Sequence, residues 1–225
     1  MTEASAPRQR RLPRAVRQQQ MLDAAVTVFA RRGYHAASMD EIAEVAGISK
    51  PMVYAYLGAK EDLFAACVRR EADRLLAAVV GVAGAGVGEL PPEELLWRGL
   101  RAFFGFVHEH RDGWSVLYRQ ARGDGGPRGT SLDGLRGQVV DVVARVLADA
   151  KAAHGSERTA GTGVDLRAFA HALVGAIESL AGWMVDHPQE SPDAVASRLM
   201  NLVWVGFDDL LRGEVWRPPI VAERG

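Results

Sequence analysis

Hydrophobic residues recur at three- and four-residue spacing through most of the chain, which is typical of amphipathic α-helices. Met21, Leu22, Ala25, Val28 and Phe29 show this spacing in the first such segment. No segment alternates hydrophobic and polar residues over a strand's length, so we expect an all-α protein with about nine helices. Glycine, proline and serine set the boundaries, and the helices are predicted at about residues 14–33, 39–46, 50–57, 60–80, 93–110, 114–122, 131–154, 165–187 and 191–212.

The composition is that of a globular protein, with 48% hydrophobic and 24% charged residues in 225. One cysteine, Cys67, excludes a disulfide framework and a multi-cysteine metal site within one chain. The longest weakly polar run, Leu75–Gly88, has 14 residues, and a membrane span needs about 20. The first 20 residues hold five arginines and no apolar core of a secretory signal. We therefore expect a soluble cytoplasmic protein with no membrane partner.

The charge is distributed unevenly, although the net charge is only −1. Residues 1–60 carry nine Lys/Arg against five Asp/Glu, a net +4, and the rest of the chain carries a net −5. Lys50 and Lys60 are two of only three lysines. This asymmetry favours an N-terminal part that meets a polyanion. Chance clustering on a solvated face is the alternative.

Residues 33–60 have the pattern of a helix-turn-helix. Ser38 and Glu41 form a capping-box pair at the start of one short helix. Gly47 permits a sharp reversal with positive φ, and Ser49 is expected to cap the second helix. The angle between the two helices requires buried apolar residues, predicted as Ile42, Val45, Ile48 and Val53.

The second short helix is the candidate DNA reader, because in this motif it enters the major groove. Lys50 and Lys60 bracket it, and Tyr54 and Tyr56 supply hydroxyls. Two tyrosines separated by one residue cannot both face one core, so at least one is expected to be exposed. Helix-turn-helix shapes also occur in proteins that do not bind DNA, and the pattern alone leaves that alternative open.

The residues that follow one another in this region also resemble a known family. The similar segments are Asp23-Ala24-Ala25, Phe29, Gly33-Tyr34, Ser38-Met39, Glu41-Ile42-Ala43, Ala46-Gly47-Ile48-Ser49-Lys50, Val53-Tyr54-Ala55-Tyr56 and Lys60-Glu61-Asp62-Leu63. Over about residues 18–66 they resemble the N-terminal module of TetR-family transcriptional regulators. The resemblance implies a dimer whose second short helices lie in successive major grooves of an operator.

The same resemblance implies which residues meet DNA. Lys60 and Ser38 match phosphate-contacting positions, and an anion suits the helix N-terminus at Ser38. Lys50, Met52 and Ala55 are the implied base readers. The full predicted DNA-binding set is Ser38, Ser49, Lys50, Pro51, Met52, Tyr54, Ala55, Tyr56 and Lys60. Two departures stand out: Pro51 replaces a frequent glycine and removes one backbone donor, and Leu57 replaces an aromatic residue.

These patterns divide the chain into four parts. We expect a basic arm at 1–13, a DNA-binding domain at 14–60, a ligand-binding and dimerisation domain at 61–214 and a tail at 215–225. The arm could enter a minor groove or serve as a disordered solubilising tail.

The last two predicted helices carry small and apolar residues on more than one face, which favours packing on both sides. The resemblance implies a four-helix bundle between two copies, whereas a large monomer core is the alternative. The predicted dimerisation residues are Ala172, Gly175, Ser179, Gly182, Leu199, Leu202 and Gly206.

Aromatic and polar residues in the middle helices are candidates for a small-molecule pocket, because pockets are mainly apolar with few polar groups. The predicted ligand-binding residues are Trp97, Phe104, His108, Trp114, Tyr118, His171 and Glu178. Ordinary core packing, or for His171 and Glu178 a solvated stripe, is the alternative.

The chain lacks the short motifs of nucleophilic hydrolases, P-loop enzymes and helical zinc peptidases. We therefore expect no catalytic residue, no metal and no cofactor. The function hypothesis is a homodimeric transcriptional regulator, a repressor released from a palindromic operator by a small-molecule effector. The alternatives are a DNA-binding regulator or chromosome-organising protein without an effector, and a helical small-molecule-binding protein.

Overall fold

The computed structural model describes residues 13–84, 90–121, 133–153 and 166–211, and these contain nine helices and no strand. The predicted all-α fold is therefore confirmed. The helices are α1 (Arg14–Ala36), α2 (Met39–Ala46), α3 (Lys50–Leu57), α4 (Lys60–Gly84), α5 (Pro92–Glu109), α6 (Arg111–Ala121), α7 (Asp133–Ala153), α8 (Leu166–Asp186) and α9 (Pro192–Leu211). The predicted arm at 1–13 and tail at 215–225 lie almost wholly outside the described residues.

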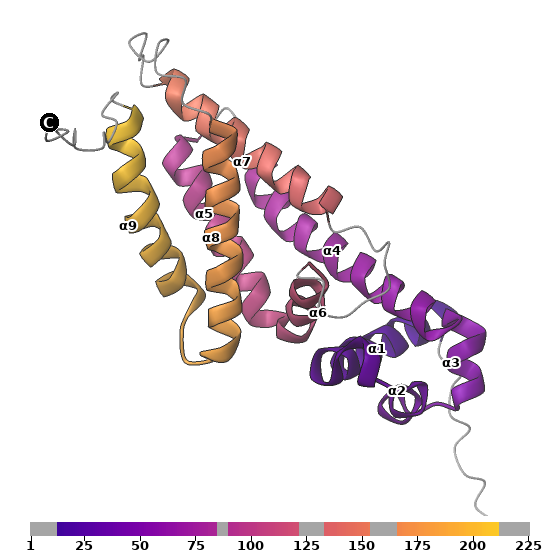
Figure 1. The fold of residues 1–225 in the computed structure, drawn as a ribbon. Helices are drawn as coiled ribbons and strands as arrows, with labels where there is room; N and C mark the ends of the chain where they lie inside the picture. The colour runs from indigo at the N-terminus through magenta and orange to yellow at the C-terminus, as the bar shows by residue number, and fades with distance from the viewer. Residues whose placement is uncertain (1–12, 85–89, 122–132, 154–165, 212–225) are drawn as a thin grey trace, which may run out of the picture.

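The molecule is elongated, with a small head at one end and a helical body at the other (Figure 1). Helices α1, α2 and α3 form the head, and α4 runs from the head along the body. In the body α4 packs on α5, α7 packs on α8, and α9 packs chiefly on α5. The described end of α9 lies far from the head.

Three glycines with positive φ set the turns of the head. Gly33 (φ 74°) kinks α1 near its end, Gly47 (φ 66°) reverses the chain after α2, and Gly58 (φ 75°) separates α3 from α4. Only glycine adopts such angles without strain. The prediction of a left-handed residue at Gly47 is confirmed.

The main hydrophobic cluster extends through head and body because α4 contributes to both, and a smaller cluster of Val140, Leu147, Ala170 and Val174 lies between α7 and α8. In the head, Phe29 packs edge-on against Phe64 of α4, with ring centroids 4.9 Å apart. Further along α4, Leu75 belongs to the same buried cluster as Phe104 and Trp114 of the body. The first turns of α4 thus belong to the head core, beyond the predicted division at residue 60.

Two local predictions about the head are wrong. Val45 is 50% exposed, because the buried face of α2 follows Met39, Ile42 and Ala43. Ser49 stands at the N-cap of α3, but its side chain makes no capping hydrogen bond.

The capping box at α2 is half formed. Ser38 Oγ accepts a hydrogen bond from the Glu41 backbone N–H at 3.1 Å, as predicted. The Glu41 carboxylate instead accepts a bond from Arg32 Nε at 3.1 Å and ties α2 to α1.

Helix α8 is long and apolar enough, by length and composition, to cross a membrane: its mean hydropathy reaches 1.4. This helix contains no long uninterrupted apolar run, because Arg167, His171 and Glu178 interrupt it. Only 28% of the apolar window is buried inside the chain, and Phe169, Ala172 and Trp183 are among the exposed residues of α8.

Candidate DNA-binding head and ligand cavity

Helix α3 presents its polar and small side chains outward at the tip of the head. Val53 and Leu57 are buried beneath it, and Val53 has no exposed surface. Tyr54 is 46% exposed. The other predicted contact residues on this surface are exposed or half-buried: Ser49, Lys50, Pro51, Met52, Ala55 and Tyr56. An eight-residue helix with one buried and one open face has the shape required to lie in a groove.

Lys50 at the start of α3 is held by an acidic neighbour. Its Nζ donates to Asp40 Oδ2 at 2.9 Å, and both side chains are exposed. The hydrogen bond and charge of Asp40 raise the pKa of Lys50 above its ordinary value. To read a base, Lys50 must leave Asp40.

Two arginines at the start of α1 lie against α3, and the sequence analysis did not include them in the DNA-binding set. The Arg14 guanidinium lies 5.2 Å from the centroid of the Tyr56 ring. Arg17 Nη1 lies 4.0 Å from Met52 Sδ. The position of these arginines beside α3 depends on folding, because more than thirty residues separate Arg17 from Met52. The basic charge near the N-terminus of the chain was the available signal.

The two predicted phosphate contacts outside α3 have different surroundings. Ser38 is exposed, and its hydroxyl accepts from Glu41 while its own proton remains available to an acceptor. Lys60 Nζ donates to the carbonyl oxygen of His35 at 3.1 Å and lies 4.8 Å from the Tyr34 ring centroid. Lys60 thus also fastens α4 to the end of α1.

The body encloses a cavity of about 280 Å³ between α4, α5, α6, α7 and α8. Its lining is mainly leucine and valine, with aromatic rings from Phe103, Trp114 and Tyr118. The charged residues of the lining are Arg136 of α7 and Glu178 of α8, whose Nε and Oε1 are 3.0 Å apart. This lining suits a largely apolar ligand.

The structure places three of the predicted ligand-binding residues in the cavity lining and the other four outside it. Trp114, Tyr118 and Glu178 line the cavity. Phe104 is fully buried in the core, Trp97 lies outside the lining under Arg101, and His108 and His171 are exposed. In α5, Leu96, Gly99 and Phe103 face the cavity. Valines of α7 outside the predicted set also line it: Val139, Val142, Val143 and Val146.

A buried ionic cluster joins the head to the body. Glu71 of α4 is only 1% exposed, and its Oε1 lies 2.7 Å from Arg70 Nη2 and 3.1 Å from Arg74 Nη1. Arg70 also reaches Asp23 of α1, with Nη1 and Oδ1 2.7 Å apart. The other Glu71 oxygen lies against Gly113 of α6, where an added Cβ would approach it to 2.5 Å.

The predicted dimerisation residues divide between the inside and the outside of the chain. Ala172 is exposed on α8, Ser179 is exposed and also lines the cavity, and Leu202 of α9 is 73% exposed. Gly175 lines the cavity, Gly182 touches the Tyr118 ring, and Leu199 is buried. The burial of Gly206 is not among the described features of α9.

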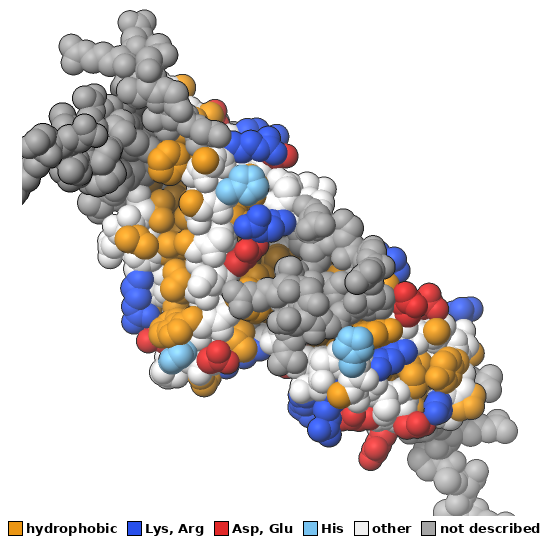
Figure 2. All heavy atoms as spheres, in the orientation of Figure 1, with side chains coloured by type: hydrophobic (Ala, Val, Ile, Leu, Met, Phe, Trp, Pro, Cys, Tyr) orange, Lys and Arg blue, Asp and Glu red, His pale blue; other side chains and the backbone are white. Residues whose placement is uncertain are grey.

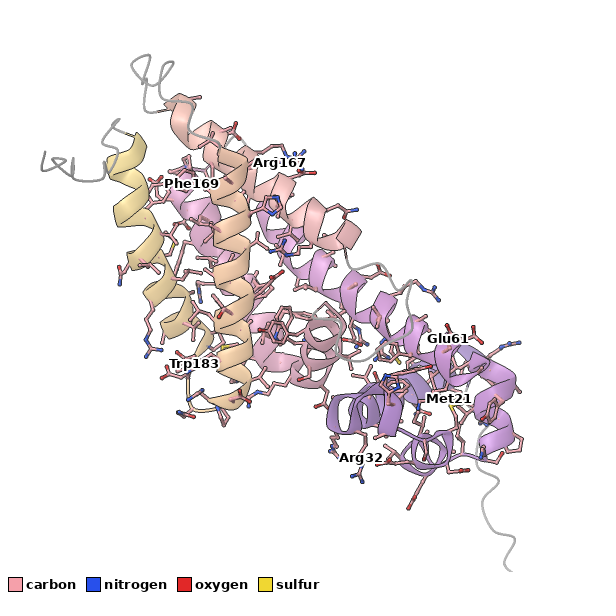
Figure 3. The ribbon with its side chains drawn as sticks, in the orientation of Figure 1. Met21, Arg32, Glu61, Arg167, Phe169 and Trp183 are labelled. Atoms are coloured by element: carbon pink, nitrogen blue, oxygen red, sulfur yellow. The ribbon has the colours of Figure 1, made fainter. Side chains whose placement is uncertain are left out.

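The outward apolar face of α8 follows a stripe adjacent to the predicted one. Phe169 and Trp183 are 41% and 37% exposed, and they lie at opposite ends of α8 (Figure 3). Figure 2 shows hydrophobic side chains gathered in a band over α8 and α9. We call the exposed apolar residues of α8 and α9 the apolar band: Phe169, Ala172, Trp183 and Leu202.

No group of three or more His, Cys, Asp and Glu side chains within the described ranges could hold a metal ion. Cys67 is buried, and its Sγ lies 3.8 Å from the carbonyl oxygen of Leu22. Burial raises the pKa of the Cys67 thiol to about 12, which keeps it protonated and unreactive at neutral pH.

Comparison with known families supports both parts of this architecture. Residues 21–67 match the family described as bacterial regulatory proteins, tetR family, and residues 92–206 match the tetracyclin repressor-like C-terminal domain. The chain belongs to the TetR family. Members of this family are transcriptional regulators with an N-terminal helix-turn-helix DNA-binding domain, as the resemblance implied, and the family is not one of enzymes.

Curated TetR-family relatives match over part of their length. The chain is 41% identical over 108 residues to the HTH-type transcriptional activator FasR of Mycolicibacterium smegmatis, covering 48% of each protein. It is 31% identical over 110 residues to the HTH-type transcriptional regulator BetI of Rhizobium meliloti, covering 48% of this chain and 53% of BetI. The chain thus spans about half the length of the curated relatives it matches.

Solved structures match over most of the chain. A TetR-like transcriptional regulator from Rhodococcus sp. RHA1 is 44% identical, with a TM-score of 0.73, over 88% of this chain and 99% of that one. The fatty acid degradation regulator FadR of Bacillus halodurans is 19% identical, with a TM-score of 0.63 over 88% and 99% of the chains. AibR, solved with isovaleryl coenzyme A and operator DNA, is 19% identical, with a TM-score of 0.64 over 83% and 97%. The last two share the fold.

Proposed function

We propose that this TetR-family chain acts as a homodimeric, ligand-responsive repressor whose α3 helices read two half-sites of an operator. The observation that carries the proposal is the outward face of α3, where Lys50, Tyr54 and Ala55 are exposed above the buried Val53 and Leu57. Phosphate contacts position such a helix, and contacts to base edges specify the sequence.

Each residue of the proposed DNA surface has a role that follows from its chemistry. The ammonium of Lys50 can bind guanine acceptors, and the methyl group of Ala55 can contact a thymine methyl. Tyr54 and Ser38 donate hydroxyl protons to phosphate oxygens. Arg14 and Arg17 lie beside α3 and supply positive charge for the neighbouring backbone.

The apolar band on α8 and α9 supports dimerisation. Because Leu202 is 73% exposed in the single chain, a second copy that covers it would bury apolar surface at small cost to the fold. A twofold axis that runs along the body would put the two heads at the same end of the dimer. Half-sites separated by one helical turn, about 34–36 Å, would then be read together.

The cavity is the proposed effector site, and its lining favours an acyl compound. The mainly leucine and valine lining accepts a hydrocarbon chain, and the volume of about 280 Å³ limits its length. Two proteins of the same fold are named as a regulator of fatty acid degradation and as a complex with isovaleryl coenzyme A. Those names suggest acyl compounds as the first effectors to test.

An effector changes DNA affinity only if it binds one arrangement of the two heads more tightly than the other. The ionic cluster around Glu71 supports a route for this effect, since α6 lines the cavity and also contacts Glu71 at Gly113. Arg70 continues from Glu71 to Asp23 on α1 of the head. A displacement of α6 would therefore reach the head through α4.

The decisive experiment selects duplexes from random DNA with the purified chain and then measures affinity with and without acyl compounds. The proposal predicts a palindromic operator, binding that falls with salt concentration, and release by at least one acyl compound. Sequence-selective binding that no acyl compound alters would leave a DNA-binding regulator without that effector. Indifference to every duplex at low salt would exclude the function.

Activation is the second candidate for the regulatory outcome, because the relative FasR is named a transcriptional activator. In vitro transcription from a promoter that carries the selected operator separates the two outcomes. Repression predicts fewer transcripts when the chain is added and recovery with the effector. More transcripts on addition of the chain would show activation instead.

A further inference from the structure

The aromatic wall of the cavity contains a polar group without a partner. Trp114 is only 5% exposed, and its indole Nε1 is fully buried with no hydrogen-bond partner among the described residues. A buried donor left unpaired costs about 1–3 kcal/mol, and buried Trp N–H groups usually find a partner. An acceptor is therefore expected at this atom in the functional state.

Trp114 is itself a lining residue of the cavity, so a ligand in the cavity can supply that acceptor once the ring shifts to expose Nε1. Phe103 meets the ring edge-on at 5.3 Å between centroids, and Tyr118 stacks against it at 5.6 Å. Both of these rings also line the cavity. An ordered water would need two or more polar partners, which this wall supplies poorly.

We propose that the Trp114 indole N–H is the polar anchor of the effector site and donates to a neutral carbonyl oxygen of a ligand with an apolar chain. This inference rests on the proposed effector role of the cavity. A simple hydrocarbon leaves the indole N–H unpaired, so it binds less tightly. A carboxylate has a competing partner in Arg136, which is already paired with Glu178.

The position of Trp114 also links the anchor to the head. Its chain neighbour Gly113 lies against the Glu71 carboxylate, where even a Cβ has no room. A carbonyl that draws the indole toward it therefore acts one residue from the ionic cluster. Ligands that satisfy the indole N–H are expected to shift DNA affinity more than hydrocarbons of equal length.

The test compares 2-nonanone, which has a carbonyl acceptor, with 1-nonene, which has none. Affinities are measured on the full chain by displacement of the apolar dye N-phenyl-1-naphthylamine. Trp114→Phe keeps an aromatic ring and removes the donor, and Trp97→Phe is the matched control outside the cavity. Trp114→Phe is expected to weaken 2-nonanone binding by about 2- to 12-fold and 1-nonene binding by less than about 2-fold, while Trp97→Phe changes neither.

A second readout uses the wild-type chain, so it holds even if Trp114→Phe fails to fold. The indole N–H resonance of Trp114 is expected to move downfield with 2-nonanone and to stay in place with 1-nonene. Equal loss of both ligands in Trp114→Phe, or a resonance that 2-nonanone leaves in place, would overturn the anchor while the cavity stands. Failure of both compounds to displace the dye from the wild type would overturn the effector cavity itself.

Discussion

The head presents its functional side chains on the outside of one short helix, whereas the body encloses its own between five helices. In the head, residues 49–56 supply most of the proposed DNA surface. In the body, the cavity lining comes from α4, α5, α6, α7 and α8. A surface on one helix follows from local periodicity, but a cavity requires that distant helices meet at particular angles.

The two regions also use charge differently. In the head, ion pairs such as Lys50–Asp40 are exposed and can exchange for contacts with DNA. Between head and body, Glu71 is buried with Arg70, so this pair cannot exchange without exposing a desolvated charge. Exposed ion pairs therefore suit the recognition of DNA, and the buried cluster suits a fixed attachment of the head to the body.

The largest expected effect comes from Leu202→Glu, which tests whether DNA binding by the head requires dimerisation through the body. Leu202 is 73% exposed, so a single protomer tolerates the charge, but the proposed interface does not. Loss of simultaneous binding to two half-sites is expected to weaken operator binding by about 10²- to 10⁴-fold. Sedimentation gives the mass and fluorescence anisotropy gives the affinity.

The control for Leu202→Glu is Val80→Glu, a change at another exposed apolar residue, which is 42% exposed on α4. It is expected to leave both mass and affinity unchanged. A dimer of normal stability for Leu202→Glu would show that the apolar band is not the interface.

The next effect separates the buried connection from surface charge. Glu71→Ala leaves Arg70, whose side chain is 11% exposed, without its buried partner. The expected loss is about 3–5 kcal/mol in the free energy of unfolding, measured by urea denaturation. Glu94→Ala, which removes the exposed pair with Arg98, is expected to lose only about 0.3–0.5 kcal/mol. Equal losses would deny the cluster its structural role.

Tyr54→Phe tests the head alone, since it removes one exposed hydroxyl. A hydrogen bond to a charged phosphate is worth about 1.5–3 kcal/mol, so operator binding is expected to weaken by that amount. Dimerisation and dye binding by the cavity should stay unchanged. Val45→Ala, at a 50% exposed position on α2, is the control, and an unaltered affinity for Tyr54→Phe would remove this contact.

Asp40→Asn is expected to have a smaller effect in the opposite direction. It removes the carboxylate that holds Lys50 Nζ at 2.9 Å, and the loss of an exposed, solvent-screened pair has only a small effect. Operator binding is therefore expected to tighten by up to about 5-fold at low salt. Weaker binding would indicate that Asp40 positions Lys50 for the DNA.

The smallest effect at neutral pH concerns Cys67. Its pKa is raised from 9.0 to about 12, so the folded state holds the thiol proton more tightly than the unfolded state. This contribution to stability is complete below pH 9 and is lost as the pH rises from 9 toward 12. Cys67→Ser is expected to flatten that part of the stability curve, and iodoacetamide should label the wild type only after unfolding.

Most of the head could be predicted from sequence because its signals are local. Helix boundaries agree within a few residues, and the reversal at Gly47 needs only the conformational freedom of glycine. Val45 was predicted to be buried because it lies three residues after Ile42, a spacing that fits a shared helix face. Packing of α2 on α1 decides which side of Ile42 is buried, and Val45 lies on the other side. Arg14 and Arg17 were missed because their approach to α3 spans more than thirty residues.

For this chain the amino-acid sequence alone determined the all-α class, the order and approximate bounds of the helices, and the outward face of α3. Tertiary structure decided which faces of α5 and α8 enclose the cavity, and it placed Gly182 against Tyr118 and not on the outside. It also buried Glu71 between two arginines and Gly113. The reason is physical: periodicity fixes which residues share a helix face, but only the packing of helices against one another determines what that face meets.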